Sequence, residues 1–165
     1  MTEKIKALIE KLELAPHPEG GYFRETYRST GTVDLGAPFY GERNHSTCIY
    51  FLLTGDSFSA FHRINQDEAW HFYQGDPIEL HMIHPDGTHE KIIIGNEIEQ
   101  GMLPQYVVPA GSWFAAKTVG SEGYALVGCT VSPGFEFADF ELAKRQELTE
   151  KFTLHAELIT EFTRI

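Results

Sequence analysis

The chain has 165 residues, of which 42% are hydrophobic, and a formal net charge of −11. This length fits a single domain spanning 1–165, and a surface this acidic repels phosphate backbones, which excludes nucleic-acid binding. No apolar run is long enough to cross a bilayer, and the charged N-terminus lacks the apolar region of a signal peptide. We therefore predict a cytoplasmic protein that binds no membrane.

The chain is expected to begin with a short amphipathic helix. Ile5, Leu8, Ile9 and Leu12 recur at helical spacing, which predicts a helix over 3–13. Prolines and glycines then break the chain into a loop.

From residue 22 onward the pattern is that of β-strands. Short runs rich in β-branched and aromatic residues alternate with turn residues, and Pro85-Asp86-Gly87 predicts a hairpin. Many short strands at close spacing favour a sandwich or barrel. The predicted strands cover 22–29, 47–54, 57–64, 68–75, 77–83, 89–95, 105–109, 113–119 and 124–131.

The C-terminal part returns to a helical pattern. A helix is expected directly after Asp139, with that residue as its N-cap, and a second helical segment near 155–163. Cys48 and Cys129 lie inside apolar strand-like runs, where buried free thiols are expected.

The segment 61–75 concentrates side chains that bind metals or move protons. A cupin metal site has the pattern G-x5-H-x-H-x3–4-E-x6-G, with a fourth ligand in a later P-x-G-x-x-H. Glu68 and Gly75 keep that spacing, but His62 stands alone and Phe114 occupies the later ligand position. An aromatic ring does not coordinate such ions, and strand alternation places His71 on the opposite face from Glu68. We therefore predict no metal and no other cofactor.

The same residues suit chemistry without a metal. A histidine beside a carboxylate in an apolar barrel has a shifted pKa and a fixed tautomer, so His62 is the candidate general base and Glu68 its partner. Alternation by two places Phe58 and Ala60 beside His62. The alternative is a buried pair that only orders the sheet.

Further polar and aromatic side chains are candidates for ligand binding. Arg24 or Arg28 suits a clamp on an anionic group, and Arg24 shares a strand face with Thr26. His17, like His45, His81, His84 and His89, is expected to be structural or solvated. The predicted ligand-binding residues are Arg24, Thr26, Tyr50, Arg63, His71, Gln105, Trp113 and Phe135.

Several motifs together resemble a small family of uncharacterised function within the cupin superfamily. They are EGGYFRETYRS, TCIYFLL, the block H-R-x4-D-E-x-W-H-F-Y-x-G, VVPAGSWFA and GCTVSPGFEFADFEL, and they span nearly the whole chain. The resemblance implies an all-β jelly-roll barrel or sandwich with short terminal helices, in a homodimer. The nearest functional analogues are dTDP-4-dehydrorhamnose 3,5-epimerases, metal-free barrels with a histidine base that His62 matches and a tyrosine acid that cannot be assigned here.

Three functional hypotheses remain open at this point. The first is a metal-independent isomerase or epimerase acting on a sugar or nucleotide-sugar, with His62 as base and Arg24 or Arg63 holding an anionic group. The second is a barrel that binds a small polar metabolite without turnover. The third is a metal-dependent enzyme that uses His62, Glu68 and His71.

Overall fold

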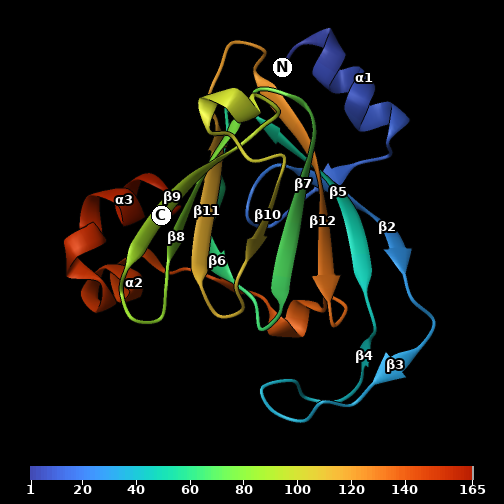
Figure 1. The fold of residues 1–165 in the computed structure, drawn as a ribbon, viewed down its shortest axis with the longest axis vertical. Coiled ribbons are helices and arrows are strands. Elements are labelled where there is room, and N and C mark those ends of the chain that lie inside the picture. The colour runs from blue at the N-terminus through green and yellow to red at the C-terminus, as the bar shows by residue number, and fades with distance from the viewer. Residues whose placement is uncertain (165) are drawn as a thin grey trace.

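Two antiparallel sheets packed face to face form the body of the protein (Figure 1). The structure is a computed structural model that describes residues 1–164. In spatial order the six-stranded sheet contains β1 (Ala15–Pro16), β2 (Tyr22–Arg28), β5 (Thr47–Thr54), β12 (Tyr124–Ser132), β7 (Asp67–Gly75) and β10 (Gln105–Val108). The five-stranded sheet contains β13 (Glu141–Leu142), β6 (Ser59–Arg63), β11 (Trp113–Thr118), β8 (Ile78–Ile83) and β9 (His89–Ile94). The predicted all-β jelly roll with terminal helices is confirmed.

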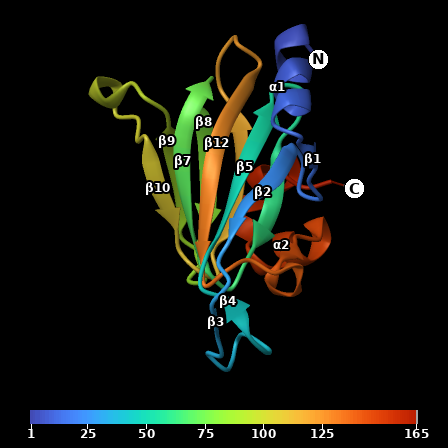
Figure 2. The same cartoon turned by 90° about the vertical axis from the view of Figure 1, so that its right-hand side faces the viewer.

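Three apolar clusters hold the layers together. The central cluster lies between the sheets and includes Phe51, Trp70, Leu80, Phe114 and Val127. A second cluster joins the outer face of the five-stranded sheet to α2 (Arg145–Lys151) and α3 (Ala156–Glu161). A third packs α1 (Glu3–Lys11) against one end of the six-stranded sheet (Figure 2). The α-helices cover only the outer faces of the sheets, so in the part of the chain that the structure describes no α-helix fills the barrel interior between them.

A small hairpin and several short helices complete the fold. β3 (Thr32–Val33) and β4 (Arg43–Asn44) form an arm that projects beyond the sheets (Figure 1). The 3-10 helices are η1 (Ile98–Gln100), η2 (Phe137–Asp139) and η3 (Thr153–His155). No helix among residues 1–164 is long and apolar enough to cross a membrane.

The segment after β12 differs from the prediction. Asp139 does not cap a helix: its carboxylate is buried and accepts hydrogen bonds of 2.7 and 2.8 Å from Arg43, and one of 2.7 Å from Gln66. The chain then forms strand β13 before α2 begins at Arg145. Asp139 pairs with the buried guanidinium of Arg43 instead of capping a helix, because a buried guanidinium without a counter-charge costs several kcal/mol of stability. The ion pair ties η2 to β4.

Two strands contain bulges that change which side chains face inward. In β2 the register slips between Glu25 and Tyr27, so Thr26 is the extra residue. In β6, His62 lies opposite Phe114, whereas Ser59 lies opposite Ala116. A bulge adds one residue to one strand, so the alternation of faces is reversed beyond it.

The two cysteines are free, as predicted. Cys48 and Cys129 lie on adjacent strands, but Cys129 belongs to the central cluster while Cys48 contacts Thr130, the neighbour of Cys129 along β12. Successive residues of a strand point to opposite faces, so the two thiols cannot meet.

Candidate functional site

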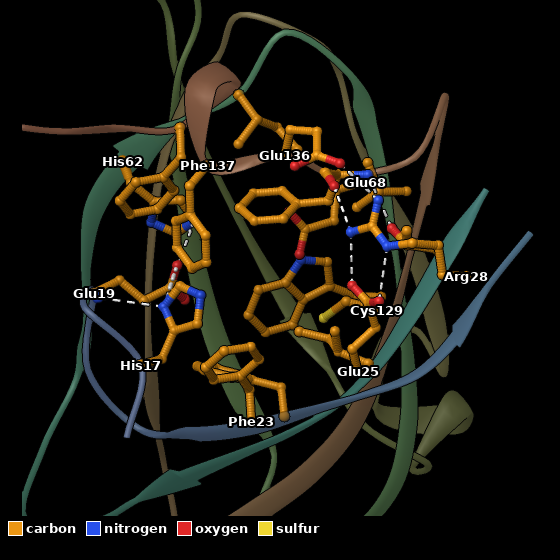
Figure 3. A pocket seen from close by; sticks show the side chains of 18 residues that line it. His17, Glu19, Phe23, Glu25, Arg28, His62, Glu68, Cys129, Glu136 and Phe137 are labelled. Atoms are coloured by element: carbon orange, nitrogen blue, oxygen red, sulfur yellow. Dashed lines mark hydrogen bonds and ion pairs between the residues drawn. The ribbon is translucent and has the colours of Figure 1, made fainter. Parts of the chain in front are cut away.

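A cavity of ≈ 90 Å³ opens between the two sheets near η2 (Figure 3). Its walls are mostly aromatic and aliphatic, and its ionisable groups come from β2, β6, β7, β12, the loop before β2 and the segment between β12 and η2. The lining residues are His17, Glu19, Phe23, Glu25, Arg28, Thr47, Ile49, Phe51, His62, Ile64, Glu68, Trp70, Cys129, Val131, Phe135, Glu136, Phe137 and Phe140.

Glu19 is placed in this cavity by the turn that follows it. Its carbonyl oxygen accepts hydrogen bonds from the Ala60 backbone N–H at 2.9 Å and from Arg164 at 2.8 Å. Gly20 has φ of 116°, and a Cβ there would lie 2.2 Å from the Phe58 carbonyl oxygen. Only glycine tolerates both that backbone conformation and that approach, so the Glu-Gly-Gly sequence sets this loop against β6.

The bulge in β6 turns two side chains toward Glu19. Ser59 Oγ donates to Glu19 Oε1 at 2.8 Å, and His62 Nε2 lies 3.0 Å from Glu19 Oε2 (Figure 3). Ser59 and His62 are three residues apart and share a face only because of the bulge. Phe58, predicted to share the face of His62, packs instead against the cluster beneath the C-terminal helices. His62 is expected from the sequence either within hydrogen-bond reach of Glu68 or open to the cavity: it lines the cavity, and its Nε2 contacts Glu19 rather than Glu68.

The Glu19–His62 contact contains one proton. His62 Nδ1 lies 2.7 Å from the Ala60 carbonyl oxygen, which only accepts, so Nδ1 carries hydrogen. The 3.0 Å contact of Nε2 with Oε2 then requires one more proton, on either the carboxyl or the imidazole. Burial lowers the pKa of His62 to about 3, and burial together with the charge of Glu68 raises the pKa of Glu19 well above its ordinary value. These shifts favour a carboxylic acid that donates to a neutral imidazole.

His17, expected from the sequence to be structural or solvated, adds a second imidazole to this group, and its side chain is 6% exposed. The backbone N–H of Glu19 donates to Nδ1 of His17 at 3.3 Å, and this nitrogen lies 3.4 Å from Glu19 Oε2. Burial lowers the pKa of His17 to about 4, so the ring is neutral at pH 7 and its hydrogen is on Nε2. That nitrogen has no hydrogen-bond partner among residues 1–164 and faces the cavity (Figure 3).

Glu68 stands on the other sheet, across the cavity from this group. Its side chain is buried, and burial raises its pKa to about 7, while the nearby Cys129 thiol and Trp70 indole limit the rise. The Trp70 N–H forms no regular hydrogen bond with Glu68 or with any other residue in 1–164. Burial and the charge of Glu68 raise the pKa of the Cys129 thiol, which is therefore not a thiolate at neutral pH.

Arg28 lies at the cavity mouth with all of its donors in use. It donates two hydrogen bonds of 2.8 Å to Glu25 and further bonds to Asn44, Glu136 and the Phe135 carbonyl. A guanidinium has five N–H donors, and these contacts occupy all of them. An incoming anion would have to displace a carboxylate from Arg28.

The arrangement of potential metal ligands over residues 1–164 bears on the metal-dependent hypothesis. Within residues 1–164 there is no group of three or more His, Cys, Asp or Glu side chains placed to hold an ion. His71, one ligand of the metal-dependent hypothesis, faces the outside of the six-stranded sheet, where it contacts Thr130 at 3.1 Å and Gln105 at 3.1 Å. His62 and Glu68 are therefore not joined by the third ligand that this hypothesis requires.

Of the predicted site residues, His62, Glu68 and Phe135 line the cavity and the other seven do not. Arg24 is paired with Glu13 on the outer face at 2.8 Å and lies over the Tyr50 ring. Thr26 donates to the Cys48 carbonyl as the bulged residue of β2. His71 and Gln105 bond to each other on that outer face.

Arg63 and Trp113 belong to a different surface. The Arg63 guanidinium stacks on the Trp113 ring at 4.6 Å and binds Glu141 at 2.7 Å. Trp113 packs in the cluster beneath α2 and α3. Neither side chain reaches the cavity.

The ionisable cavity residues that the prediction does not place in the site are His17, Glu19, Glu25, Cys129 and Glu136, and Arg28 is named there only as an alternative to Arg24. Glu19 carries a signal in the sequence, because a glutamate directly before two glycines is suited to a tight approach to another backbone. The sequence offers no reason to choose Arg28 over Arg24, since the β2 bulge that turns Arg28 inward leaves no mark in the alternation pattern.

The match to a family is decided by most of the chain. The family model described as Cupin superfamily (DUF985) matches residues 6–143. The chain belongs to this family. An uncharacterized protein of Saccharomyces cerevisiae is 34% identical over 155 residues, which cover 87% of this chain and 77% of the relative.

Solved structures agree with this placement. A hypothetical protein from Leishmania major is 36% identical with a TM-score of 0.91, covering 97% of this chain and 98% of that one. Protein SO0799 from Shewanella oneidensis is 36% identical with a TM-score of 0.86, covering 96% of each chain. Oxalate decarboxylase from Bacillus subtilis shares the fold alone, at 12% identity and a TM-score of 0.56 over 89% of this chain and 36% of that one.

Proposed function

We propose that this DUF985 cupin binds a small, neutral, sugar-like metabolite in its barrel and isomerises it by proton transfer without a metal. The observation that carries the proposal is the pair of ionisable groups on facing walls: Glu68 on β7, and opposite it His62 on β6 with Glu19 of the β1–β2 loop against it (Figure 3). A base whose pKa lies near the working pH is the most effective proton acceptor. Burial gives Glu68 that property, so the base is Glu68 rather than His62.

The charges at the site support a neutral ligand over a nucleotide-sugar. The cation that lines the cavity, Arg28, has its donors occupied by Glu25, Glu136 and two further oxygens. Two carboxylates at the mouth repel a diphosphate, and like charges at close range cost several kcal/mol in specificity. An anionic substrate therefore has no free partner.

The size of the cavity supports the same choice. A water needs roughly 10–15 Å³ on this volume scale, so ≈ 90 Å³ has room for about six waters or a ligand of comparable size. A three- to five-carbon hydroxycarbonyl compound is of this order. A nucleotide would have to extend into the acidic mouth.

Ligand screening by thermal shift tests the binding part of the proposal. Neutral ketoses and aldoses are expected to raise the melting temperature in proportion to the logarithm of their concentration, and nucleotide-sugars to leave it unchanged. Stabilisation by nucleotide-sugars alone would contradict the proposal. Conversion of a stabilising sugar, followed by NMR, then tests turnover.

Binding without turnover is the second candidate function. The observation that favours it is the aromatic cover of the cavity by Phe135, Phe137 and Phe140, whose rings contact one another edge to face. Such a cover serves a binding protein as well as an enzyme. A sugar that binds but neither exchanges its C–H protons nor isomerises would favour this candidate.

We also propose that the protein is a homodimer through the outer face of the six-stranded sheet. Exposed side chains on or beside this face include Tyr27 (54% exposed), Tyr73 (48%) and Val107 (47%), and Tyr50 and Tyr73 contact edge to face. Tyrosine and other large apolar side chains are enriched at such interfaces. Light scattering should give twice the 18.7 kDa chain mass.

We also propose that the protein is cytoplasmic. Its two free thiols support this location, because the cytosol keeps cysteines reduced.

A further inference from the structure

We propose that Glu19 is the proton donor of this site and that its substrate is a small neutral hydroxycarbonyl compound, such as a short ketose. This inference rests on the proposed isomerisation and deepens it, because it names the acid and the chemical class of the substrate.

The position of the mobile proton follows from hydrogen-bond geometry. His62 Nδ1–H is committed to the Ala60 carbonyl at 2.7 Å, so His62 has no N–H free for a substrate. The one transferable proton lies between His62 Nε2 and Glu19 Oε2, 3.0 Å apart. Glu19 lines the cavity, and Ser59 stabilises its other oxygen at 2.8 Å. His62 therefore acts as a positioning residue that holds the acid in place.

The substrate class is supported by two N–H donors beside the cavity that make no regular hydrogen bond among residues 1–164. The Trp70 indole N–H is buried and makes no hydrogen bond of regular geometry among the described residues, and Nε2 of His17, a residue that is half-buried as a whole, faces the cavity. Buried donors normally form hydrogen bonds, and a buried donor without an acceptor costs roughly 1–3 kcal/mol of stability. A ligand with oxygen acceptors toward both walls satisfies them, and a hydroxycarbonyl compound has such oxygens on adjacent carbons.

The reaction balances with these groups alone. The Glu68 carboxylate takes the proton from the carbon beside the carbonyl, and the C–H electron pair becomes the C=C bond. The π pair of the carbonyl takes the proton from Glu19, which gives a neutral enediol. Glu19 then recovers a proton from the neighbouring hydroxyl while Glu68 returns its proton to the former carbonyl carbon. The carbonyl has moved by one carbon, and both glutamates are restored.

The transient Glu19 carboxylate has stabilising partners in place. Ser59 donates to Oε1, and the guanidinium of Arg164, which binds the Glu19 carbonyl at 2.8 Å, lowers the pKa of this carboxyl relative to burial alone. The step therefore does not leave an uncompensated charge in the barrel.

Deuterium exchange tests the assignment with defined probes. Wild-type protein in D₂O is expected to exchange the α-hydrogens of dihydroxyacetone, erythrulose or xylulose, as seen by ¹H NMR. Glu19→Gln keeps the volume and a neutral donor toward His62, so it should keep probe affinity within about threefold and lose exchange by about 100-fold or more. Glu13→Gln, an exposed glutamate paired with Arg24, is the matched control and should exchange like wild type.

The outcomes separate the inference from the function on which it rests. Exchange that is lost in Glu68→Gln but retained in Glu19→Gln would overturn the assignment of Glu19 and leave the proposed isomerase standing. Exchange retained in Glu68→Gln, or absent from wild type with all three probes, would overturn the proposed function as well.

The tautomer of His62 gives a test that needs no substrate. ¹⁵N NMR should show Nδ1 protonated and Nε2 as an unprotonated, hydrogen-bonded nitrogen, unchanged from about pH 5 to 8. A proton on both nitrogens would make the imidazolium the donor and overturn the role of Glu19. A proton on Nε2 alone would remove the shared proton altogether and have the same consequence.

Discussion

The two faces of the six-stranded sheet contain similar polar residues and differ in what surrounds them. On β7, Glu68 and Trp70 face the cavity, whereas His71 faces outward and pairs with Gln105 and Thr130. Inside, burial moves the pKa of Glu68 to about 7. Outside, hydrogen bonds to neighbouring surface side chains satisfy His71. Residue type alone therefore does not mark the functional face, because the surroundings determine what an ionisable group can do.

Matched substitutions on the two faces should give the largest contrast. Glu68→Gln is expected to lower proton exchange of a bound ketose by about 10²–10⁴-fold, because it removes the general base. His71→Gln on the same strand should leave exchange within about twofold. Comparable losses in both variants, measured by NMR at saturating probe, would show that the outer face takes part in the chemistry.

The free energy of unfolding should depend on pH because Glu68 is buried. Its folded pKa of about 7 lies above the ordinary 4.5, so the native state binds more protons than the unfolded state between these values. Stability from this group is present below pH 4.5 and is lost as pH rises through 7. The loss is at most about 3 to 4 kcal/mol, since one pKa unit is worth about 1.4 kcal/mol.

Glu68→Gln removes this dependence, so the variant should gain stability over wild type above pH 7 and match it near pH 4.5. Urea denaturation at both pH values measures the difference. His71→Gln should follow the wild-type curve. Equal curves for wild type and Glu68→Gln would mean that water solvates Glu68 in the native state.

Most of the fold could be predicted because strand patterns and turn residues are local signals. All predicted strands from 22–29 to 124–131 correspond to observed ones, and the terminal helix over 3–13 is observed as Glu3–Lys11. The helix expected from Asp139 failed because a long-range partner, Arg43, takes that carboxylate. The prediction of the site missed Glu19 for the same reason, because Glu19 reaches His62 through a long-range loop contact that residue spacing does not reveal.

The outer face should respond to charge through assembly rather than chemistry. The double variant Tyr27→Lys/Tyr73→Lys is expected to raise the dissociation constant of the proposed dimer by about 10- to 100-fold, because two copies would bring like charges together. Tyr40→Lys, on the projecting arm where Tyr40 is 87% exposed, serves as the control. Light scattering at several concentrations measures the effect. An unchanged mass for the double variant would place the dimer contact elsewhere.

The smallest contrast concerns two arginines of β2 that the bulge at Thr26 directs to opposite faces. Without the bulge, Arg24 and Arg28 would share one face by alternation. With it, Arg28 reaches the cavity mouth and binds Glu25 and Glu136, while Arg24 stays outside on Glu13.

Arg28→Gln leaves two mouth carboxylates without their cation, so it should weaken binding of a neutral ketose by about threefold and destabilise the fold by about 1 kcal/mol. Arg24→Gln should change stability by less than about 0.5 kcal/mol, as for an exposed ion pair. Urea denaturation and calorimetric titration of both variants measure the contrast. A larger effect from Arg24 than from Arg28 would assign ligand contact to the outer face and contradict the site described for this barrel.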